Sequence, residues 1–210
     1  ADCVGLEVLF PLLNIRAEIT ELVGSWTNID LALLVIDLER EHFEKLNDYA
    51  STFAFDAQLT QEQELITVGF GIANNPNDEM MVNMDDDCKV FSASDEFKFM
   101  ADPDALNPAS YKSWSFANGC DISHGDSGSA MVDREQGDIV GIIWTGKIPK
   151  SKLVQSSANL EKILLENSPL IWEELSYAVP AFKIGEFFAE INAGEHQASQ
   201  TAQEIVEAML

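Results

Sequence analysis

The chain has 210 residues, of which 46% are apolar and 23% charged, a composition typical of a folded protein rather than a disordered one. It carries 36 Asp and Glu against 12 Lys and Arg, and the formal net charge of −24 repels nucleic-acid backbones and anionic lipid headgroups. The longest apolar stretches, such as Leu31–Ile36 and Ile139–Trp144, are too short to span a bilayer. We therefore expect no nucleic-acid partner and no membrane span.

The first third of the sequence contains three candidate strands. Val4–Phe10 and Ile29–Ile36 are rich in Val, Leu, Ile and Phe, which predicts two buried strands. Between Asp37 and Gln63 charged residues dominate and apolar residues recur at mixed spacing, a pattern that fits either a short helix or a long loop. Leu65–Gly71 follows as a further strand that ends on glycine.

The rest of the chain continues as short strands and then changes to a helical pattern. Arg134–Asp138 predicts a turn that joins two of the strands into a hairpin. Lys183–Asn192 places four apolar side chains on one helical face, and the tail beyond Gly194 is weakly amphipathic. Short strands at this spacing are typical of a sandwich or barrel. The later candidate strands are Cys88–Phe91, Trp114–Phe116, Ala130–Asp133, Ile139–Thr145 and Tyr177–Pro180.

The segment from Gly119 to Ala130, between two of these strands, carries the strongest chemical signal. A serine flanked by glycines can occupy a tight turn in which the N–H groups of Gly125 and Ser127 point to one spot, the geometry of an oxyanion hole. Asp126 could fix that turn by a buried ion pair or by hydrogen bonds. Gly, Asp and Ser are also common turn residues, so the tetrapeptide alone has a purely structural explanation.

The wider context resembles the trypsin-like serine proteases. Gly125–Ser129, followed by an apolar strand, a glycine turn and Ile139–Gly146, is similar to the nucleophile region and the substrate-pairing strand of that family. Asn28–Leu34 resembles the segment in which an aspartate orients the catalytic histidine. The resemblance implies that Ser127 is the nucleophile, that Asp30 is the orienting acid, and that a protein or peptide substrate pairs beside Trp144, Thr145 and Gly146.

The same resemblance implies the fold. Leu65–Gly71 is similar to the strand that opens the family's second barrel, and Tyr177–Pro180 to its closing strand. We therefore expect an all-β, chymotrypsin-like double antiparallel β-barrel with a C-terminal helix and an incomplete first barrel. Residues 1–60 would form the latter part of the first barrel, 61–193 the second barrel with the helix, and 194–210 a tail that extends the helix, meets a partner or frays.

The general base of the family is missing from its usual place, because no histidine precedes Asp30. We expect His42 and His196 at the surface, and His124 on the rim of the oxyanion turn, where it contacts substrate or has no chemical role. Since a buried, unpaired carboxylate is costly, Asp30 needs a hydrogen-bonding partner, and a buried imidazole would serve. We expect the histidine to come from an upstream segment or chain, and the alternative is a pseudoprotease that acts as a binding or regulatory module.

The resemblance also bears on the cysteines and on specificity. It implies a disulfide between Cys88 and Cys120 in an exported, secreted or periplasmic protein, and a bond from Cys3 to the upstream segment. Asp121 stands six positions before Ser127, where trypsin-like members carry the aspartate that binds a basic side chain, which favours cleavage after Arg or Lys. The same aspartate also occurs in bacterial relatives of other specificity.

Two acidic segments contain possible calcium ligands. Asp85–Asp87 and Asn74–Glu79 offer oxygen ligands of the kind calcium prefers, but their spacing matches no ordered calcium loop. Cysteine and histidine residues likewise lack the spacing of a zinc site. We predict no required metal and no cofactor.

Overall fold

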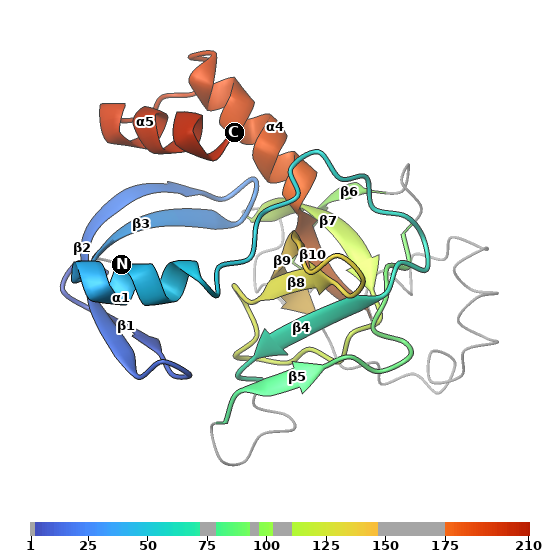
Figure 1. Ribbon diagram of the computed structural model, residues 1–210. Coiled ribbons are helices and arrows are strands. Elements are labelled where there is room, and N and C mark those ends of the chain that lie inside the picture. The colour runs from blue at the N-terminus through green and yellow to red at the C-terminus, as the bar shows by residue number, and fades with distance from the viewer. Residues whose placement is uncertain (1–2, 72–78, 93–96, 103–110, 147–174) are drawn as a thin grey trace.

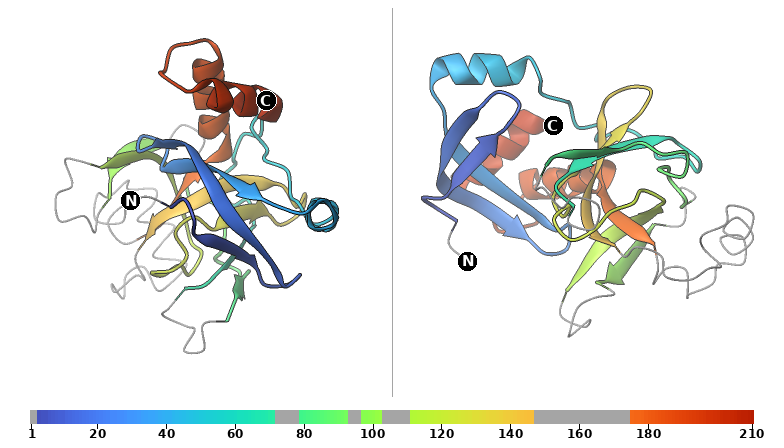
Figure 2. Two further views of the ribbon diagram at one scale, coloured as in Figure 1. Left: turned by 90° about the vertical axis from the view of Figure 1, so that its left-hand side faces the viewer. Right: turned by 90° about the horizontal axis from the view of Figure 1, so that it is seen from below.

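The computed structural model describes residues 3–71, 79–92, 97–102, 111–146 and 175–210 (Figure 1). Two antiparallel sheets, one of three strands and one of seven, form most of this part of the chain. Two helices near the C-terminus lie across one end of both sheets, as Figures 1 and 2 show from different sides. The chain is therefore mostly β-structure with a C-terminal helix, as predicted.

The three-stranded sheet is built from β1 (Glu7–Phe10), β2 (Ile15–Trp26) and β3 (Leu31–Asp37), in the order β1-β2-β3. Alternate side chains at the start of β2 are buried, including Ile15, Ala17 and Ile19, so one face of the sheet packs inward. A strand near Val4–Phe10 is confirmed, but its predicted burial is wrong because β1 lies at the edge of the sheet, with Leu9 47% exposed.

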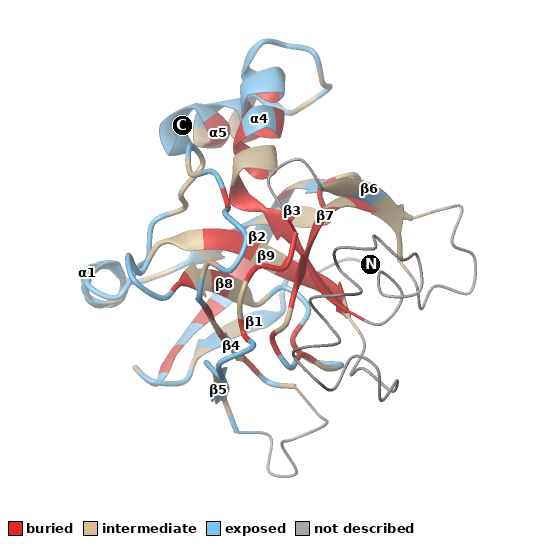
Figure 3. Ribbon diagram, turned by 90° about the vertical axis from the view of Figure 1, so that its right-hand side faces the viewer, coloured by how far each residue is buried: buried red, intermediate tan, exposed pale blue. Residues whose placement is uncertain are grey.

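The seven-stranded sheet has the order β5-β4-β8-β9-β10-β7-β6. Its strands, in chain order, are β4 (Leu65–Gly69), β5 (Met81–Asn83), β6 (Lys98–Ala101), β7 (Lys112–Asn118), β8 (Ala130–Asp133), β9 (Ile139–Gly146) and β10 (Ser176–Pro180). The central strands β9, β10 and β7 are the most buried, and Figure 3 shows them largely in red. The sequence did not predict β5 or β6, which are short and lie at opposite edges.

The hairpin between β8 and β9 is confirmed, and Asp133 explains its turn. The Asp133 carboxylate accepts hydrogen bonds from the backbone N–H groups of Glu135 and Gln136, at 2.8 and 2.6 Å. Gly137 adopts a φ of 80°, a left-handed conformation that glycine adopts at little cost. The prediction of a strand at Cys88–Phe91 is wrong, because residues 89 and 90 form only isolated bridges to Glu64 and Asn118.

Within the described residues, helices occupy three places outside the sheets. The segment Asp37–Gln63 contains the helix α1 (Arg40–Asn47), in agreement with the first of its two interpretations. α4 (Ala181–Asn192) and α5 (Gln200–Met209) follow β10 at the C-terminus. Within the part of the chain that the structure describes, no helix is long and apolar enough to cross a membrane.

Two clusters of buried apolar side chains hold this arrangement together. The first joins the C-terminal helices to both sheets, through Ile29 before β3, Tyr177 in β10 and Phe188 in α4. The second lies within the seven-stranded sheet and includes Leu65, Phe116 and Met131, which are fully buried. Because the first cluster includes Ile29, the residue directly before Asp30, it fixes the position of that carboxylate relative to the larger sheet.

Candidate active site

The predicted nucleophile lies on a sharp turn between the disulfide and β8. Gly125 and Gly128, on either side of Asp126 and Ser127, have φ angles of 105° and 86°, which L-residues with a side chain rarely adopt. A Cβ on Gly125 would also overlap the carbonyl oxygen of Phe70. The glycines are therefore required by the shape of the turn, and that shape leaves Ser127 exposed.

Two backbone donors on this turn are available. The N–H groups of Gly125 and Ser127 donate to no other atom among the residues that the structure describes, whereas those of Asp126 and Gly128 bond to the carbonyls of Ser123 and Ile143. Two unbonded backbone donors close to an exposed serine are what an oxyanion hole requires. The geometry is thus compatible with the role predicted for Gly125 and Ser127.

The buried side chain of Asp126 stabilises the turn. Its side chain is only 8% exposed, and one carboxylate oxygen accepts a hydrogen bond of 2.9 Å from the backbone N–H of Ser123. The carboxylate lies against Gly69 and Gly71, so closely that a Cβ at either position would overlap it. Of the two possibilities left open by the sequence, the structure shows hydrogen bonds and no ion pair at Asp126 within its described part.

The turn is also bonded to β9. The N–H of Gly128 donates to the carbonyl of Ile143 at 2.7 Å, and the N–H of Ile143 donates to the carbonyl of Ser129 at 2.9 Å. These two bonds continue the β8–β9 ladder, which ends at the Ala130–Ile142 pair. Ser127 is thereby held next to the strand that the sequence identified as the substrate-pairing strand.

Asp30 lies in the turn before β3 and is half-buried, with a φ of 42°. Its carboxylate accepts a hydrogen bond from the hydroxyl of Tyr111, so the expectation that an imidazole would partner it is not met in the described chain. Burial raises the pKa of Asp30 above its ordinary value, and the nearby carboxylate of Asp102 raises it further. No sequence pattern marks Tyr111 or Asp102 as neighbours of Asp30, because both lie more than 70 residues away along the chain.

These neighbours of Asp30 connect it to β9. The hydroxyl of Thr145 donates to Asp102 at 2.9 Å, and the Tyr111 ring lies 6.1 Å from the Trp144 ring. Thr145 is two residues beyond Ile143, a distance of roughly 7 Å along a strand. The structure therefore brings the surroundings of Asp30 and the turn of Ser127 to adjacent positions of one strand.

Trp144, Thr145 and Gly146 form the last part of β9. On one side they pair with β10, where Tyr177 lies opposite Thr145 and Ser176 opposite Gly146. On the other side, the described residues supply no strand partner beyond Ile142. The indole of Trp144 is buried and donates to the Ser115 hydroxyl at 2.9 Å, so the tryptophan fixes the strand rather than presenting its ring to solvent.

None of the three histidines occupies the position of a general base. His42 lies on α1, His124 is exposed at the rim of the Ser127 turn, and His196 follows α4 with its Nε2 2.8 Å from a Glu190 carboxylate oxygen. No hydrogen bond or ion pair links any of them to Asp30 or Ser127 in the part of the chain described. Their expected placement away from the triad position agrees with this geometry.

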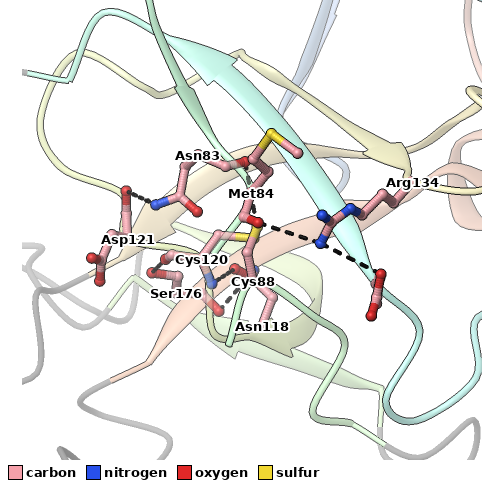
Figure 4. The surroundings of a disulfide bond; sticks show 9 residues. Asn83, Met84, Cys88, Asn118, Cys120, Asp121, Arg134 and Ser176 are labelled. Carbon is pink, nitrogen blue, oxygen red and sulfur yellow. Dashed lines mark hydrogen bonds and ion pairs between the residues drawn. A yellow bond between two sulfur atoms is a disulfide. The ribbon is translucent and has the colours of Figure 1, made fainter. Parts of the chain in front are cut away.

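The disulfide between Cys88 and Cys120 is present, as the resemblance implied, and it closes a separation of 32 residues (Figure 4). Both cysteines are buried, and Cys3 is a free, partly exposed thiol. The residue after Cys120, Asp121, has an exposed carboxylate whose pKa is raised by partial burial and by the carboxylates of Asp87 and Asp85. Its backbone carbonyl accepts a hydrogen bond from the Asn83 side chain at 3.4 Å.

No group of three or more His, Cys, Asp or Glu side chains in the described chain is arranged to hold a metal ion. The acidic segment Asn74–Glu79 lies outside the described residues except for its last position. The prediction that no metal is required stays a prediction.

The sequence matches no protein-family model and no curated protein, but the fold is similar to those of solved serine proteases. The active form of the Rv3671c protease from M. tuberculosis matches 89% of this chain and 62% of its own, with 15% identity and a TM-score of 0.52. The inactive form of a serine-to-alanine variant of the same protein matches 88% and 69%, with 14% identity and a TM-score of 0.51. The described chain has a chymotrypsin-like protease fold.

A third similar structure, the HtrA-type protease AlgW with a decapeptide, has 20% identity and a TM-score of 0.48, and the match covers 86% of this chain and 41% of AlgW. The chain thus spans about two thirds or less of the length of these protease structures.

Proposed function

We propose that the chain is part of a serine endopeptidase in which Ser127 is the nucleophile. One observation carries the proposal. Ser127 is exposed on a tight turn where, among the described residues, the N–H groups of Gly125 and Ser127 have no acceptor and the neighbouring end of β9 has no strand partner on one side. The Ser127 hydroxyl would attack the substrate carbonyl carbon and form an acyl-enzyme, the two N–H groups would stabilise the oxyanion, and water would release the acyl group.

The general base in this proposal is a histidine from an upstream segment or a separate chain. A cysteine of that segment would form a disulfide with Cys3. The proposal is supported by the positions of His42, His124 and His196, none of which contacts Asp30 or Ser127 in the described chain. The incoming imidazole would take the Ser127 proton and return it to the leaving amine, while Asp30 fixes its tautomer. Tyr111 would hold the Asp30 carboxylate in place.

The substrate would be a protein or peptide that adds a strand beside Trp144, Thr145 and Gly146, where the described residues give β9 no partner on the side away from β10. We propose cleavage after Arg or Lys, supported by the carboxylate of Asp121 and by the net charge of −24, which raises the local concentration of basic peptides. Profiling on a peptide library tests this. If Asp121→Ser leaves the preference at the cleaved position unchanged, Asp121 does not set it.

The Cys88–Cys120 disulfide supports a secreted or periplasmic location, because such bonds persist in oxidising compartments. Mass measurement of the native material with and without reduction tests two parts of the proposal at once. A mass loss on reduction would reveal a disulfide-held segment, and peptide mapping would identify its attachment to Cys3.

A fluorophosphonate probe, which labels activated serines, tests the nucleophile. We expect labelling of native material at Ser127, loss of labelling in Ser127→Ala, and retained labelling in the matched control Ser129→Ala. Without the upstream histidine, the isolated chain should react several orders of magnitude more slowly. Strong labelling of the isolated chain that disappears on replacing His42, His124 or His196 would show that the base is internal and refute the upstream segment.

The rival is a pseudoprotease that binds a partner without cleaving it. The observation that favours it is the Tyr111 hydroxyl bonded to Asp30 where a catalytic imidazole would be expected. Native, folded material with an intact disulfide that remains unlabelled at Ser127 would support this rival over the protease.

A further inference from the structure

A cavity of about 590 Å³ lies between α4 and the segment that links α1 to β4. That segment runs past α4 (Figure 1), and a Cβ on Gly185 would meet the Cβ of Phe55 at 2.8 Å, so glycine lets the two segments approach closely. Phe55, Phe97 and Phe182 line the cavity from three separate parts of the chain, and we call it the aromatic cavity. The described residues that line it belong neither to the Ser127 turn nor to β9.

The aromatic rings form walls that a ligand can reach, because all three are only partly buried. The centroids of Phe97 and Phe182 lie 5.1 Å apart and their planes are tilted by 59°, so the two rings meet as a corner. Phe182, Gly185 and Ala189 share one face of α4, since residues three and four apart on a helix are neighbours. The small side chains of the last two leave the space in front of the rings open.

The charged side chains at this cavity are carboxylates. Asp56 and Glu186 line it and are exposed, and no basic side chain of the described residues does so. Glu186 pairs with Lys183 at 2.6 Å, whereas Asp56 forms no ion pair within the described chain. Together with the net charge of −24, an unpaired carboxylate favours a cationic ligand over an anionic or neutral one.

Lys183 shows that a ring of this cavity attracts an ammonium group. Its Nζ lies 5.3 Å from the centroid of the Phe182 ring and 4.5 Å from that of Trp114. Both distances are within the roughly 6 Å over which an aromatic ring attracts a cation. Because Lys183 does not itself line the cavity, it leaves the corner between Phe97 and Phe182 to a cation from outside the chain.

We propose that the aromatic cavity binds a quaternary ammonium group, in which methyl groups surround the charge. The three rings, Gly185 and Ala189 offer no hydrogen-bonding side chain, so a primary ammonium or guanidinium group against them would lose water without a replacement. A trimethylammonium group has no N–H donor to satisfy, and it gains both attraction to the rings and apolar burial. Asp56 supplies the opposite charge.

Trimethylammonium groups occur both on small molecules and on trimethylated lysine side chains of polypeptides. The cavity recognises the chemistry that the two share, and its volume lies in the range of about 300 to 1,000 Å³ that is usual for small-molecule sites. This binding site does not depend on the proposed protease function, because it shares no described residue with the Ser127 turn.

The test compares three ligands on the native protein at constant ionic strength. Choline carries the trimethylammonium group, 3,3-dimethylbutan-1-ol has the same shape without the charge, and ethanolamine has the charge without the methyl groups. Binding is followed by the NMR signal of the Gly185 backbone amide and by the upfield shift that aromatic rings cause in the choline methyl protons. We expect saturable binding of choline and about tenfold weaker binding of the other two. Equal binding of either analogue, or no binding of choline, overturns the proposal.

Variants locate the site. Asp56→Asn and Phe182→Leu should each weaken choline binding about three- to fivefold, because each removes one exposed contact to the cation. Lys183→Gln should strengthen binding, because it removes a nearby positive charge, and damage to the fold cannot produce a gain. The matched controls are Asp48→Asn, an exposed carboxylate at the end of α1, and Phe99→Leu, an exposed ring of β6 outside the cavity. Losses equal to those of the controls, or no gain in Lys183→Gln, refute the site.

A blocked pentapeptide with one central trimethyllysine separates the two sources of the group. Binding about tenfold tighter than that of choline, at the same Gly185 signal, identifies a polypeptide side chain, whereas equal or weaker binding identifies a small quaternary ammonium compound. Fluorophosphonate labelling of Ser127 in the native protein is independent of these titrations. If labelling succeeds and choline does not bind, the cavity proposal fails and the protease proposal stands.

Discussion

Replacing Gly69 by alanine should destabilise the chain, although a glycine-to-alanine change inside a strand ordinarily gains about 0.5 to 1 kcal/mol from reduced chain entropy. Gly69 has no left-handed φ, so its backbone accepts alanine without strain. The added Cβ, however, would overlap the carboxylate of Asp126. Asp126 is 8% exposed and its carboxylate is bonded to Ser123, so moving this carboxylate away from the new methyl group breaks the hydrogen bond.

The magnitude follows from these contacts. Overpacking of a close-packed site costs about 1 to 3 kcal/mol, and displacing a charged acceptor from its hydrogen bond costs about 1.5 to 3 kcal/mol. After the entropic gain, we expect a net loss of about 1.5 to 5.5 kcal/mol, which lowers Tm by roughly 3 to 22 °C in a chain of this size. Urea unfolding followed by circular dichroism measures the loss.

A double-mutant cycle identifies the cause. In an Asp126→Ala background the new methyl group no longer meets a carboxylate, so Gly69→Ala should become nearly neutral or stabilising there. Additive losses in the double variant, or a Gly69→Ala chain as stable as the parent, would refute the inference that only glycine at position 69 leaves room for the Asp126 carboxylate.

Three further predictions concern stability. Cys120→Ala should lower the free energy of unfolding by about 4 kcal/mol in the chain-entropy model, because the lost disulfide spans 32 residues; a calorimetric Tm equal to that of the oxidised parent would contradict this. The raised pKa of Asp30 means that the folded chain binds this proton more tightly than the unfolded chain, so stability falls as the pH rises from about 3.9 through the folded pKa. Asp30→Asn should remove that fall and be the more stable form at neutral pH, as urea midpoints across this range will show. Ser199→Ala should cost about 1 kcal/mol in thermal unfolding, because the Ser199 hydroxyl caps α5 by accepting from the N–H of Ala202 at 3.1 Å; Ser199→Asp, which retains a capping acceptor, should lose little.

The sequence revealed the features that depend on neighbouring residues. The Ser127 turn could be predicted because its glycines lie next to the serine, and the β8–β9 hairpin because Gly137 and Asp133 define its turn locally. β2 was missed for an equally local reason. Register shifts after Ile19 and Leu22 interrupt the alternation of buried and exposed side chains, so only the first half of the strand shows a period of two.

Contacts between segments that are distant in the chain could not be predicted from the sequence. The hydrogen bond between Tyr111 and Asp30 joins residues 81 positions apart, and no local pattern marks Tyr111, because any buried donor can satisfy a carboxylate. The histidine partner that the resemblance implies stays a prediction. The aromatic cavity beside α4 is likewise lined by segments that are distant from one another in the chain. Cys88, Val90 and Phe91 are buried through the disulfide and isolated bridges, without forming a strand.

The end of β9 explains why so much of the candidate site meets at one place. The register with β10 shifts between Tyr177 and Ala178, which lie opposite Thr145 and Ile143, so Trp144 is an extra residue in a β-bulge. A bulge breaks the alternation of faces, and three consecutive side chains from Ile143 to Thr145 are buried here instead of alternating. Ile143 can then bond the Ser127 turn through its backbone while the Trp144 indole reaches Ser115 and the Thr145 hydroxyl reaches Asp102. One inserted residue thus lets a single strand contact both the nucleophile turn and the surroundings of Asp30, and a regular strand would direct one of these neighbouring side chains to the opposite face.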